Sequence, residues 1–258
     1  MHLYINLFGL SIPSYGFMIA TGVIIANLIA VFVLKKTGLD FNDFIIIEAY
    51  CMLGGFVGAK LLYFIVSYQT IEWSRILELQ YFNEVMKSGF VFYGGLIGGL
   101  LMAFAAGRIH KIDSKRYIRT FIFLIPMIHS FGRIGCFMAG CCYGKPYDGI
   151  GAVVFPENSF ALAGISLFPV QIVEAGILMI IAIIILVLQF RKNWYFTIET
   201  YLILYGIARF CLEYLRYDEI RGTAAGLSTS QWISILIIGI SLVVCIVKLR
   251  CHRKELPE

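Results

Sequence analysis

Runs of apolar residues that are each long enough to cross a lipid bilayer constrain this chain more than any other feature. A membrane-spanning helix needs about 20 mostly apolar residues, because its backbone must cross roughly 30 Å of hydrocarbon. Hydrophobic residues make up 60% of the sequence and charged residues only 14%, with a mean hydropathy of +0.84. These values exclude an ordinary soluble globular domain. The apolar runs cover residues 13–34, 44–67, 89–107, 120–140, 169–190, 195–214 and 229–248.

The runs predict an all-α, polytopic membrane protein with seven transmembrane helices. No polar segment between them is long enough to build a core of its own, so we expect a single domain over residues 1–258. The loop at about 68–88 is amphipathic and predicts an interfacial helix on the outer membrane surface. The loop at about 143–168 is rich in Gly and Pro and is also expected on the outer side.

The positions of the basic residues predict the orientation of the chain. Cytoplasmic loops of membrane proteins carry an excess of Lys and Arg. With the N-terminus outside and the C-terminus inside, the loops that face inward hold Lys35, Lys36, Arg108, Lys111, Lys115, Arg116, Arg119, Arg191, Lys192, Lys248, Arg250, Arg253 and Lys254. The loops that face outward hold Arg75, Lys87, Lys145, Arg216 and Arg221. This asymmetry explains the net charge of +5, and we therefore expect no nucleic-acid partner.

Several polar and ionisable side chains lie inside the predicted spans or at their edges. A charge near the middle of the bilayer costs on the order of 3 kcal/mol, so such residues are usually paired or functional. They are Lys60, Arg133, Gln171, Glu174, Arg209 and Glu213. Arg209 and Glu213 are four residues apart and share a helix face, which also fits a salt bridge that holds two helices together. Arg133 also fits a side chain that reaches the membrane interface. Guanidinium groups gathered at one depth would suit a phosphate, and in a membrane the obvious phosphate is a lipid headgroup.

Glycines gather in the outer halves of four predicted spans. The clusters read "YGFMIATG", "GGFVGAKLLY", "GFVFYGGLIGGL" and "GRIGCFMAG". Close packing of transmembrane helices is one explanation of each cluster. Their common depth favours a shared region in which the backbone departs from helix and lines a cavity.

Three of the seven cysteines follow Arg133 in the stretch "GRIGCFMAGCCYG". Cys136, Cys141 and Cys142, with His129, suggest a metal site, but they lack the Cys-x-x-Cys spacing of zinc knuckles. A disulfide among them is a second possibility. The interpretation we favour is that the three thiols and His129 line a pocket, without a metal. His129 shares a helix face with Arg133, and a lone histidine in a span is more often a hydrogen-bonded packing residue.

The chain resembles the bacterial prolipoprotein diacylglyceryl transferases along nearly its whole length. The resemblance rests on "LSIPSYGFMIATG", "GGFVGAKLLYFI", "SGFVFYGGLIGGLL", "GRIGCFMAGCCYG", "FPVQIVEAG" and "LYGIARFCLEYLR", which occur in the family's order and spacing. It implies transfer of a diacylglyceryl group from phosphatidylglycerol to the lipobox cysteine thiol of a lipoprotein signal peptide. The products are a thioether and glycerol phosphate, and no cofactor takes part. It also implies a multi-pass protein of the bacterial plasma membrane, among membrane lipids, with its active site toward the outer leaflet.

The resemblance assigns roles residue by residue. It places the family's signature arginine on Arg133, its second essential arginine on Arg209 and the acidic residue that follows on Glu213. In the best-studied branch the signature continues with two asparagines and a glutamate, where this chain has Cys136, Ala139 and Cys141.

The third-span motif departs from that branch as well. There it begins with a histidine proposed to take part in proton transfer, where this chain has Tyr93 in "YGG". This leaves the identity of the base open among Tyr93, Glu174, Glu213 and His129.

These considerations define the expected site and its alternatives. The expected catalytic residues are Arg133, Arg209, Glu213 and Tyr93. The expected phospholipid-binding residues are Arg133, Tyr15, Gly16, Lys60, Gly94, Gly95, Gly144, Gln171 and Glu174. One alternative is a divergent family member that uses another lipid donor or acceptor. Others are a membrane thiol–disulfide oxidoreductase using Cys141 and Cys142, and a transporter or lipid-binding protein with the same fold.

Overall fold

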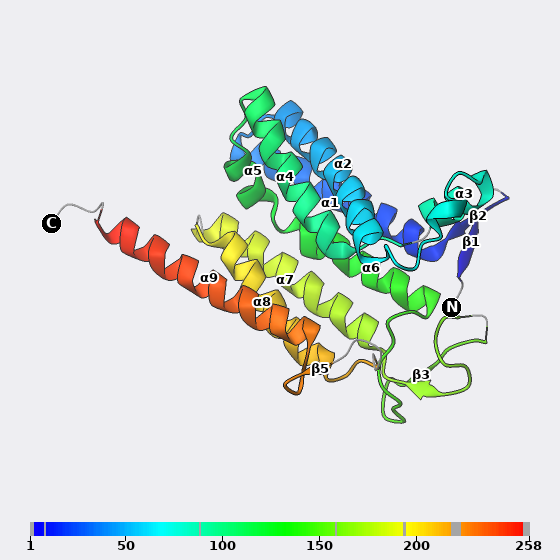
Figure 1. Ribbon diagram of the computed structural model, residues 1–258. Coiled ribbons are helices and arrows are strands. Elements are labelled where there is room, and N and C mark those ends of the chain that lie inside the picture. The colour runs from blue at the N-terminus through cyan, green and yellow to red at the C-terminus, as the bar shows by residue number, and fades with distance from the viewer. Residues whose placement is uncertain are drawn as a thin grey trace. The chain divides into compact units, whose positions relative to one another are not determined.

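A computed structural model of the chain describes residues 3–7, 9–87, 89–157, 159–192, 195–217 and 223–254. Helices dominate this part of the chain (Figure 1). The α-helices are α1 (Ser14–Thr37), α2 (Phe41–Val66), α3 (Leu79–Lys87), α4 (Phe92–His110), α5 (Ser114–Phe121), α6 (Leu124–Ala139), α7 (Val170–Lys192), α8 (Thr197–Glu213) and α9 (Thr229–Lys254). Short antiparallel hairpins pair β1 (Tyr4–Leu7) with β2 (Leu10–Pro13), β3 (Val153–Val154) with β4 (Ser166–Leu167), and β5 (Thr223–Ala224) with β6 (Leu227–Ser228).

The long helices follow the apolar runs of the sequence. Among the described residues, α1, α2, α7 and α9 are each long and apolar enough to cross a membrane. The pair α5 and α6, bent by 47°, makes a fifth span if it is counted as one. Helices α4 and α8, of 19 and 17 residues, coincide with the two remaining runs. The expected all-α, polytopic membrane class is confirmed, whereas the seven spans and their orientation remain predictions. Arg221, one of the cations used to predict that orientation, lies outside the described residues.

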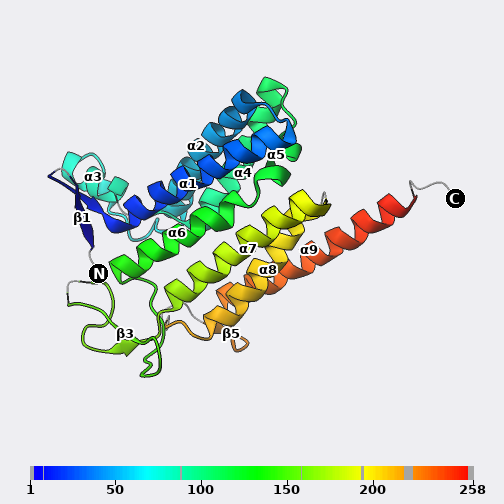
Figure 2. The same ribbon diagram turned by 180° about the vertical axis from the view of Figure 1, so that it is seen from behind.

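The chain divides into two compact units. The first unit consists of Met1–Ala30 and Arg119–Glu258, and the second of Val31–Ile118. In the first unit α6 contacts α7, α7 contacts α8, and α8 contacts α9, and these helices lie side by side in both views (Figure 1, Figure 2). In the second unit α2 packs against α4.

Glycines on facing surfaces explain how α2 and α4 approach each other. Gly54 faces Gly98 and Gly58 faces Gly94, so the two helices run antiparallel. A Cβ on any of these four glycines would overlap the backbone carbonyl oxygen of the glycine that faces it on the other helix. The pairs repeat the spacing of four residues with which small side chains bring transmembrane helices together. The expectation that the backbone departs from helix was therefore wrong at these four glycines, because they lie inside α2 and α4; residues 89–91 at the start of the third-span cluster precede α4.

The fourth apolar run is broken rather than continuous. Helix α5 ends at Phe121, and α6 begins at Leu124. Pro126 is the third residue of α6, where its missing N–H would have had no partner inside the helix. In a continuous helix the ring of Pro126 would clash with the carbonyl group of Ile122. The break upstream of Pro126 avoids that clash.

The loop at 143–168 forms a small apolar core with the end of α6. Phe155, Ala161 and Leu167 are buried together, and Phe137 of α6 packs against them. The rings of Phe137 and Phe155 meet edge to face, with centroids 5.7 Å apart. This cluster fixes the loop against the helix end that carries the cysteines.

The loop at 68–88 contains a 3₁₀ turn (Trp73–Arg75) followed by α3. Ile71 is buried, whereas Leu77 and Leu79 are exposed. Lys60 of α2 reaches the end of α3 and donates hydrogen bonds from Nζ to the carbonyl oxygens of Val85 (2.6 Å) and Met86 (3.2 Å). A cation at a helix C-terminus interacts favourably with the carbonyl groups left unpaired there.

Candidate functional site

The C-terminus of α6 folds the three cysteines onto one another. Gly140 has a φ of 74°, in the left-handed region that glycine adopts without strain. Its N–H bonds to the carbonyl of Phe137, and the N–H of Cys141 bonds back to the carbonyl of Cys136 at 3.0 Å. This pair of hydrogen bonds is a Schellman motif. It turns the chain so that Cys141 lies against Cys136 instead of continuing away from it.

The three thiols form a compact cluster, defined by Cys136, Cys141 and Cys142. Their sulfur atoms all lie within 4.8 Å of one another. Cys142 has a φ of 58°, which is unusual for a residue other than glycine. Hydrogen bonds from the other two thiols, aided by the charges of Arg216 and Arg133, hold the pKa of Cys142 below its ordinary value, although burial opposes this. The cluster thus combines sulfur ligands with nearby positive charge.

Arg133 of α6 forms an ion pair with Glu174 of α7. The distance from Nε to Oε2 is 3.0 Å, and both side chains are largely buried. The atoms are not aligned as a hydrogen bond, so Coulomb attraction is the main interaction. Among the described residues, Nη1 and Nη2 of Arg133 make no hydrogen bond or ion pair. The outer edge of this guanidinium is therefore available to a ligand.

Gln171, one turn before Glu174, is fully buried and ties α7 to the cysteine loop. Its Nε2 donates a 2.9 Å hydrogen bond to the carbonyl oxygen of Cys141. Its Oε1 has no hydrogen-bond partner among the described residues. A buried acceptor without a partner is costly, and it marks a place where a ligand hydroxyl would fit.

Arg209 and Glu213 are held by the start of α9. Arg209 Nη2 lies 2.8 Å from Glu213 Oε2 and donates a 3.0 Å hydrogen bond to Ser230 Oγ. Ser228 Oγ donates a 2.9 Å hydrogen bond to the other oxygen of Glu213. Nη1 of Arg209 is buried without a hydrogen-bond partner in the described part of the chain. This guanidinium also has unused donor capacity.

A reciprocal cap fixes these serines. The Oγ of Ser228 accepts from the N–H of Gln231, and Oε1 of Gln231 accepts from the N–H of Ser228. The arrangement is a capping box, in which the first turn of the helix satisfies its own free N–H groups. The sequence contained its signature, Ser-x-x-Gln before an apolar run, but our sequence analysis did not identify it.

The cysteine loop is also bound to the end of α8. Gly144 and Arg216 form an antiparallel bridge, and the N–H of Lys145 donates to the carbonyl of Leu215 at 2.9 Å. A Cβ on Gly144 would overlap the backbone at Phe168 and Leu215, so only glycine fits there. The bridge brings the buried Arg216 toward Cys142. Arg216 was not among the expected site residues, although it continues the helix face of Arg209 and Glu213.

The start of α1 packs on α6 beside Arg133. A Cβ on Gly135 would lie 2.9 Å from the Cα of Tyr15, so the two helices touch at this point. The Tyr15 side chain is partly exposed and interacts electrostatically with Arg133 and Cys136. Gly16, by contrast, has open space where a side chain would stand. The structure thus brings Tyr15 to the site.

His129 of α6 lies one helical turn before Arg133. It interacts electrostatically with both Arg133 and Arg209, and its ring meets that of Tyr205 edge to face at 5.6 Å. The first unit thus contains two buried guanidinium groups that interact electrostatically with one histidine, and each is paired with its own carboxylate. Their remaining donors give this site the chemistry of an anion-binding pocket.

The other expected site residues belong to the second unit. The ammonium group of Lys60 contacts backbone carbonyls and lies over the rings of Tyr63 and Phe90, which favours a structural role. Gly94 packs against α2, and a Cβ on Gly95 would lie 3.2 Å from the carbonyl oxygen of Gly55. Tyr93 is partly exposed at the start of α4. The roles of all four toward substrate remain predictions.

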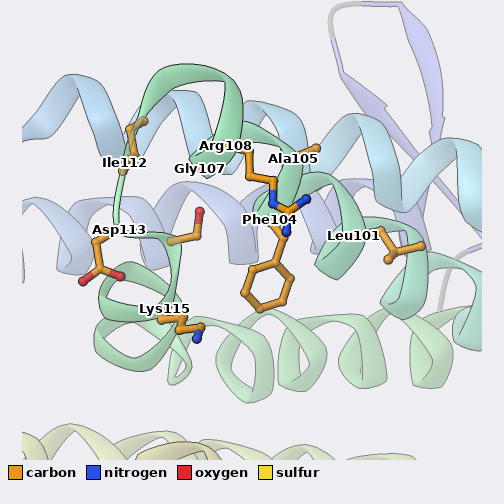
Figure 3. Close-up of a pocket in the computed structure, with 9 residues that line it drawn as sticks. Leu101, Phe104, Ala105, Gly107, Arg108, Ile112, Asp113 and Lys115 are labelled. Atoms are coloured by element: carbon orange, nitrogen blue, oxygen red, sulfur yellow. The ribbon is translucent and has the colours of Figure 1, made fainter.

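A pocket of about 680 Å³ also lies in the second unit, at the turn from α4 to α5 (Figure 3). Arg108, Asp113 and Lys115 line it together with apolar side chains such as Phe104. None of the expected site residues belongs to it. We therefore place the candidate site at the arginines of the first unit.

Comparisons with known proteins match nearly the whole chain to one family. Residues 2–247 match the family described as prolipoprotein diacylglyceryl transferase. A phosphatidylglycerol–prolipoprotein diacylglyceryl transferase 2 of Clostridium perfringens is 36% identical, over 98% of this chain and 97% of its own length. A phosphatidylglycerol–prolipoprotein diacylglyceryl transferase of Clostridium tetani is 35% identical, over 91% of this chain and 93% of its own.

Proposed function

This chain belongs to the prolipoprotein diacylglyceryl transferase family, and we propose from that premise that it transfers a diacylglyceryl group from phosphatidylglycerol to prolipoproteins. The acceptor is the lipobox cysteine thiol of the signal peptide, and the product is a thioether. The observation that carries the proposal is the pair of buried guanidinium groups of Arg133 and Arg209, each with donors left over after its ion pair.

The reaction needs a group that holds the leaving phosphate. Sulfur attacks a glyceryl carbon as the bond from that carbon to the phosphate oxygen breaks, so negative charge develops on the departing glycerol phosphate. Donors fixed in place before the reaction stabilise such charge best in a site that excludes water. Arg133 offers Nη1 and Nη2, and Arg209 offers Nη1. We assign the phosphate to these atoms.

The carboxylates position the arginines. Glu213 pairs with Arg209 and accepts a hydrogen bond from Ser228, while Glu174 pairs with Arg133. Each carboxyl group thereby orients the guanidinium group of its partner. Gln171 Oε1, which has no hydrogen-bond partner among the described residues, would accept a hydrogen bond from a hydroxyl of the glycerol headgroup, and we propose that Tyr15 and Gly144 contact the same phospholipid.

The acceptor thiol must lose its proton, because the thiolate is the nucleophile. Tyr93 stands at the position of the usual histidine, and we retain it as a proposed catalytic residue together with Arg133, Arg209 and Glu213. We further propose that the protein lies in the bacterial plasma membrane with the N-terminus outside. The site then opens toward the outer leaflet, where lipobox cysteines and phosphatidylglycerol meet.

A transfer assay with purified protein tests the function. Phosphatidylglycerol labelled in its acyl chains is presented in mixed micelles with a peptide that carries a lipobox. We expect label on the peptide, glycerol phosphate in equal amount, and no label on a matched peptide in which serine replaces the cysteine. Absence of label from the cysteine peptide, with folded protein, would exclude this acceptor. Label delivered from another phospholipid but not from phosphatidylglycerol would point to a divergent family member.

A further inference from the structure

The cysteine cluster has the composition and size of a site for one thiophilic cation. Zinc binds cysteine sulfur at about 2.3 Å, so three sulfurs around one tetrahedral ion lie roughly 3.8 Å apart. The sulfurs of Cys136, Cys141 and Cys142 already lie within 4.8 Å of one another. Small rotations of the side chains would close the remaining difference.

The backbone around the cluster is fixed without any ion. The Schellman motif at Gly140 turns Cys141 back onto Cys136, and the fully buried Gln171 anchors the carbonyl of Cys141. The bridge to Arg216 fixes the backbone of Gly144, which lies two residues after Cys142. A site whose ligands are placed in advance loses less entropy when an ion binds.

Positively charged side chains lie close to the cysteine cluster. Three cysteine thiolates and one Zn²⁺ carry a net charge of −1, and −2 once the acceptor thiolate binds, which is costly inside a membrane protein unless cations lie nearby. Arg216 forms the backbone bridge to Gly144, two residues after Cys142, and Arg133 precedes Cys136 by three residues on α6. Glu213 and Glu174 offset part of this positive charge.

We propose that Cys136, Cys141 and Cys142 bind one Zn²⁺ ion as thiolates, and that the acceptor thiol of the substrate is its fourth ligand. The second part rests on the proposed function. Zinc sites that act on substrates have three protein ligands and an open fourth position, and a thiol that binds zinc gives up its proton, here to water. The sequence-based expectation of a pocket without metal rested on spacing along the chain. The turn at Gly140 brings the sulfurs together regardless of that spacing.

Metal binding is measured first and requires no transfer activity. The full-length protein is purified in detergent under a reducing phosphine and exchanged into metal-free buffer. We expect it to take up one Zn²⁺ per chain, and Co²⁺ in its place to give the sulfur-to-cobalt charge-transfer band of a four-coordinate site. Cys136→Ser, Cys141→Ser and Cys142→Ser should each lower zinc affinity by about a hundredfold or more, since each removes one of three thiolates. Cys51→Ser and Cys211→Ser, which change cysteines outside the cluster, should bind as the parent does.

Folding is checked for every variant by thermal melting in detergent, and Cys→Ala variants at the same positions repeat the test with a different side chain. Zinc uptake below one ion per chain, uptake that the cluster variants leave intact, or a disulfide between two of the three cysteines in the reduced protein would overturn the site.

The fourth ligand is tested on the Co²⁺-loaded protein. A lipobox peptide should change the visible bands of the cobalt ion, and the matched serine peptide should not. Identical spectra with both peptides would overturn the role of the acceptor thiol. Stoichiometric zinc in a protein that transfers no diacylglyceryl group would instead count against the proposed function alone.

Discussion

Arg133 and Glu174 stand 41 positions apart in the chain, and their side chains form a buried ion pair of 3.0 Å between α6 and α7. The pair uses Nε of the guanidinium, and the two terminal nitrogens make no hydrogen bond or ion pair among the described residues. A guanidinium held at its inner edge by a carboxylate presents a fixed fork at its outer edge, which suits a phosphate. The same logic applies to Arg209, which Glu213 and Ser230 hold from one side.

We expect Arg133→Lys to lose most of the transfer activity. Lysine keeps the charge, but its ammonium group lacks the planar guanidinium fork that lets Arg133 contact Glu174 on one edge and a phosphate on the other. Loss of a fixed donor to the leaving group predicts a decrease of about a hundredfold or more in kcat/KM. The measurement is transfer of labelled diacylglyceryl to a lipobox peptide. Arg75→Lys is the matched control, since Arg75 forms an exposed ion pair far from α6 in the sequence. Activity near that of the parent in a folded Arg133→Lys protein would remove Arg133 from the phosphate site.

Arg209→Ala should reduce activity more than Glu213→Ala. In our proposal Arg209 contacts the phosphate, whereas Glu213 only orients Arg209, and Ser230 still holds the guanidinium when Glu213 is gone. We expect about a hundredfold loss for the first variant and a clearly smaller loss for the second. The transfer activity of Ser230→Ala should lie between that of Glu213→Ala and that of the parent protein. If Glu213→Ala proves the more damaging change at equal thermal stability, then Glu213 takes part in the chemistry directly.

Gly58→Ala is expected to destabilise the second unit. The new methyl group would overlap the carbonyl oxygen of Gly94, so α2 and α4 must separate. Overpacking of this kind costs about 1–3 kcal/mol and should lower the melting temperature in detergent. Gly239→Ala in α9 is the control, because nothing lies near the position of its Cβ. A Gly58→Ala protein as stable as the Gly239→Ala protein would contradict this packing of the two helices.

Lys111 and Lys145 are predicted to lie on opposite sides of the membrane. The excess of Lys and Arg in one set of loops places the first inside and the second outside. Cysteines introduced separately at the two positions are labelled in intact cells with a membrane-impermeant maleimide, with the parent protein as the background. We expect labelling at position 145 only, and labelling at 111 after the cells are opened. Equal labelling of both in intact cells would refute the proposed topology.

The sequence alone determined the class of the protein. Apolar runs of membrane-spanning length force helices, because hydrocarbon offers no partner for an unpaired backbone group. It also identified Arg133, Arg209 and Glu213, since charges inside apolar runs are conspicuous. The spacing of Arg209 and Glu213 also fitted a salt bridge, because four residues along a helix return to the same face.

Other features depended on contacts between segments that are distant in the sequence. The partner of Arg133 is on α7, the serines that hold Arg209 and Glu213 are at the start of α9, and Arg216 reaches the cysteine loop through a bridge to Gly144. No local pattern encodes such pairings. The glycines of α2 and α4 are a further example. Their sequence fits either close helix packing or an irregular backbone, and only the contacts with the facing helix show that it is close packing.

The cysteines show most clearly the difference between what the sequence determines and what the tertiary structure determines. Their spacing argued against a metal site, because the local rule for zinc knuckles describes short loops and says nothing about a helix end. The left-handed turn at Gly140 is a local feature of the helix end, whereas the anchor from Gln171 comes from α7 through the tertiary structure; together they hold Cys136, Cys141 and Cys142 close to one another. The sequence determined which residues carry charge and sulfur within the membrane, because burial in lipid restricts composition. Only the fold determined which of them meet, because distances between helices depend on side-chain packing and not on separation along the chain.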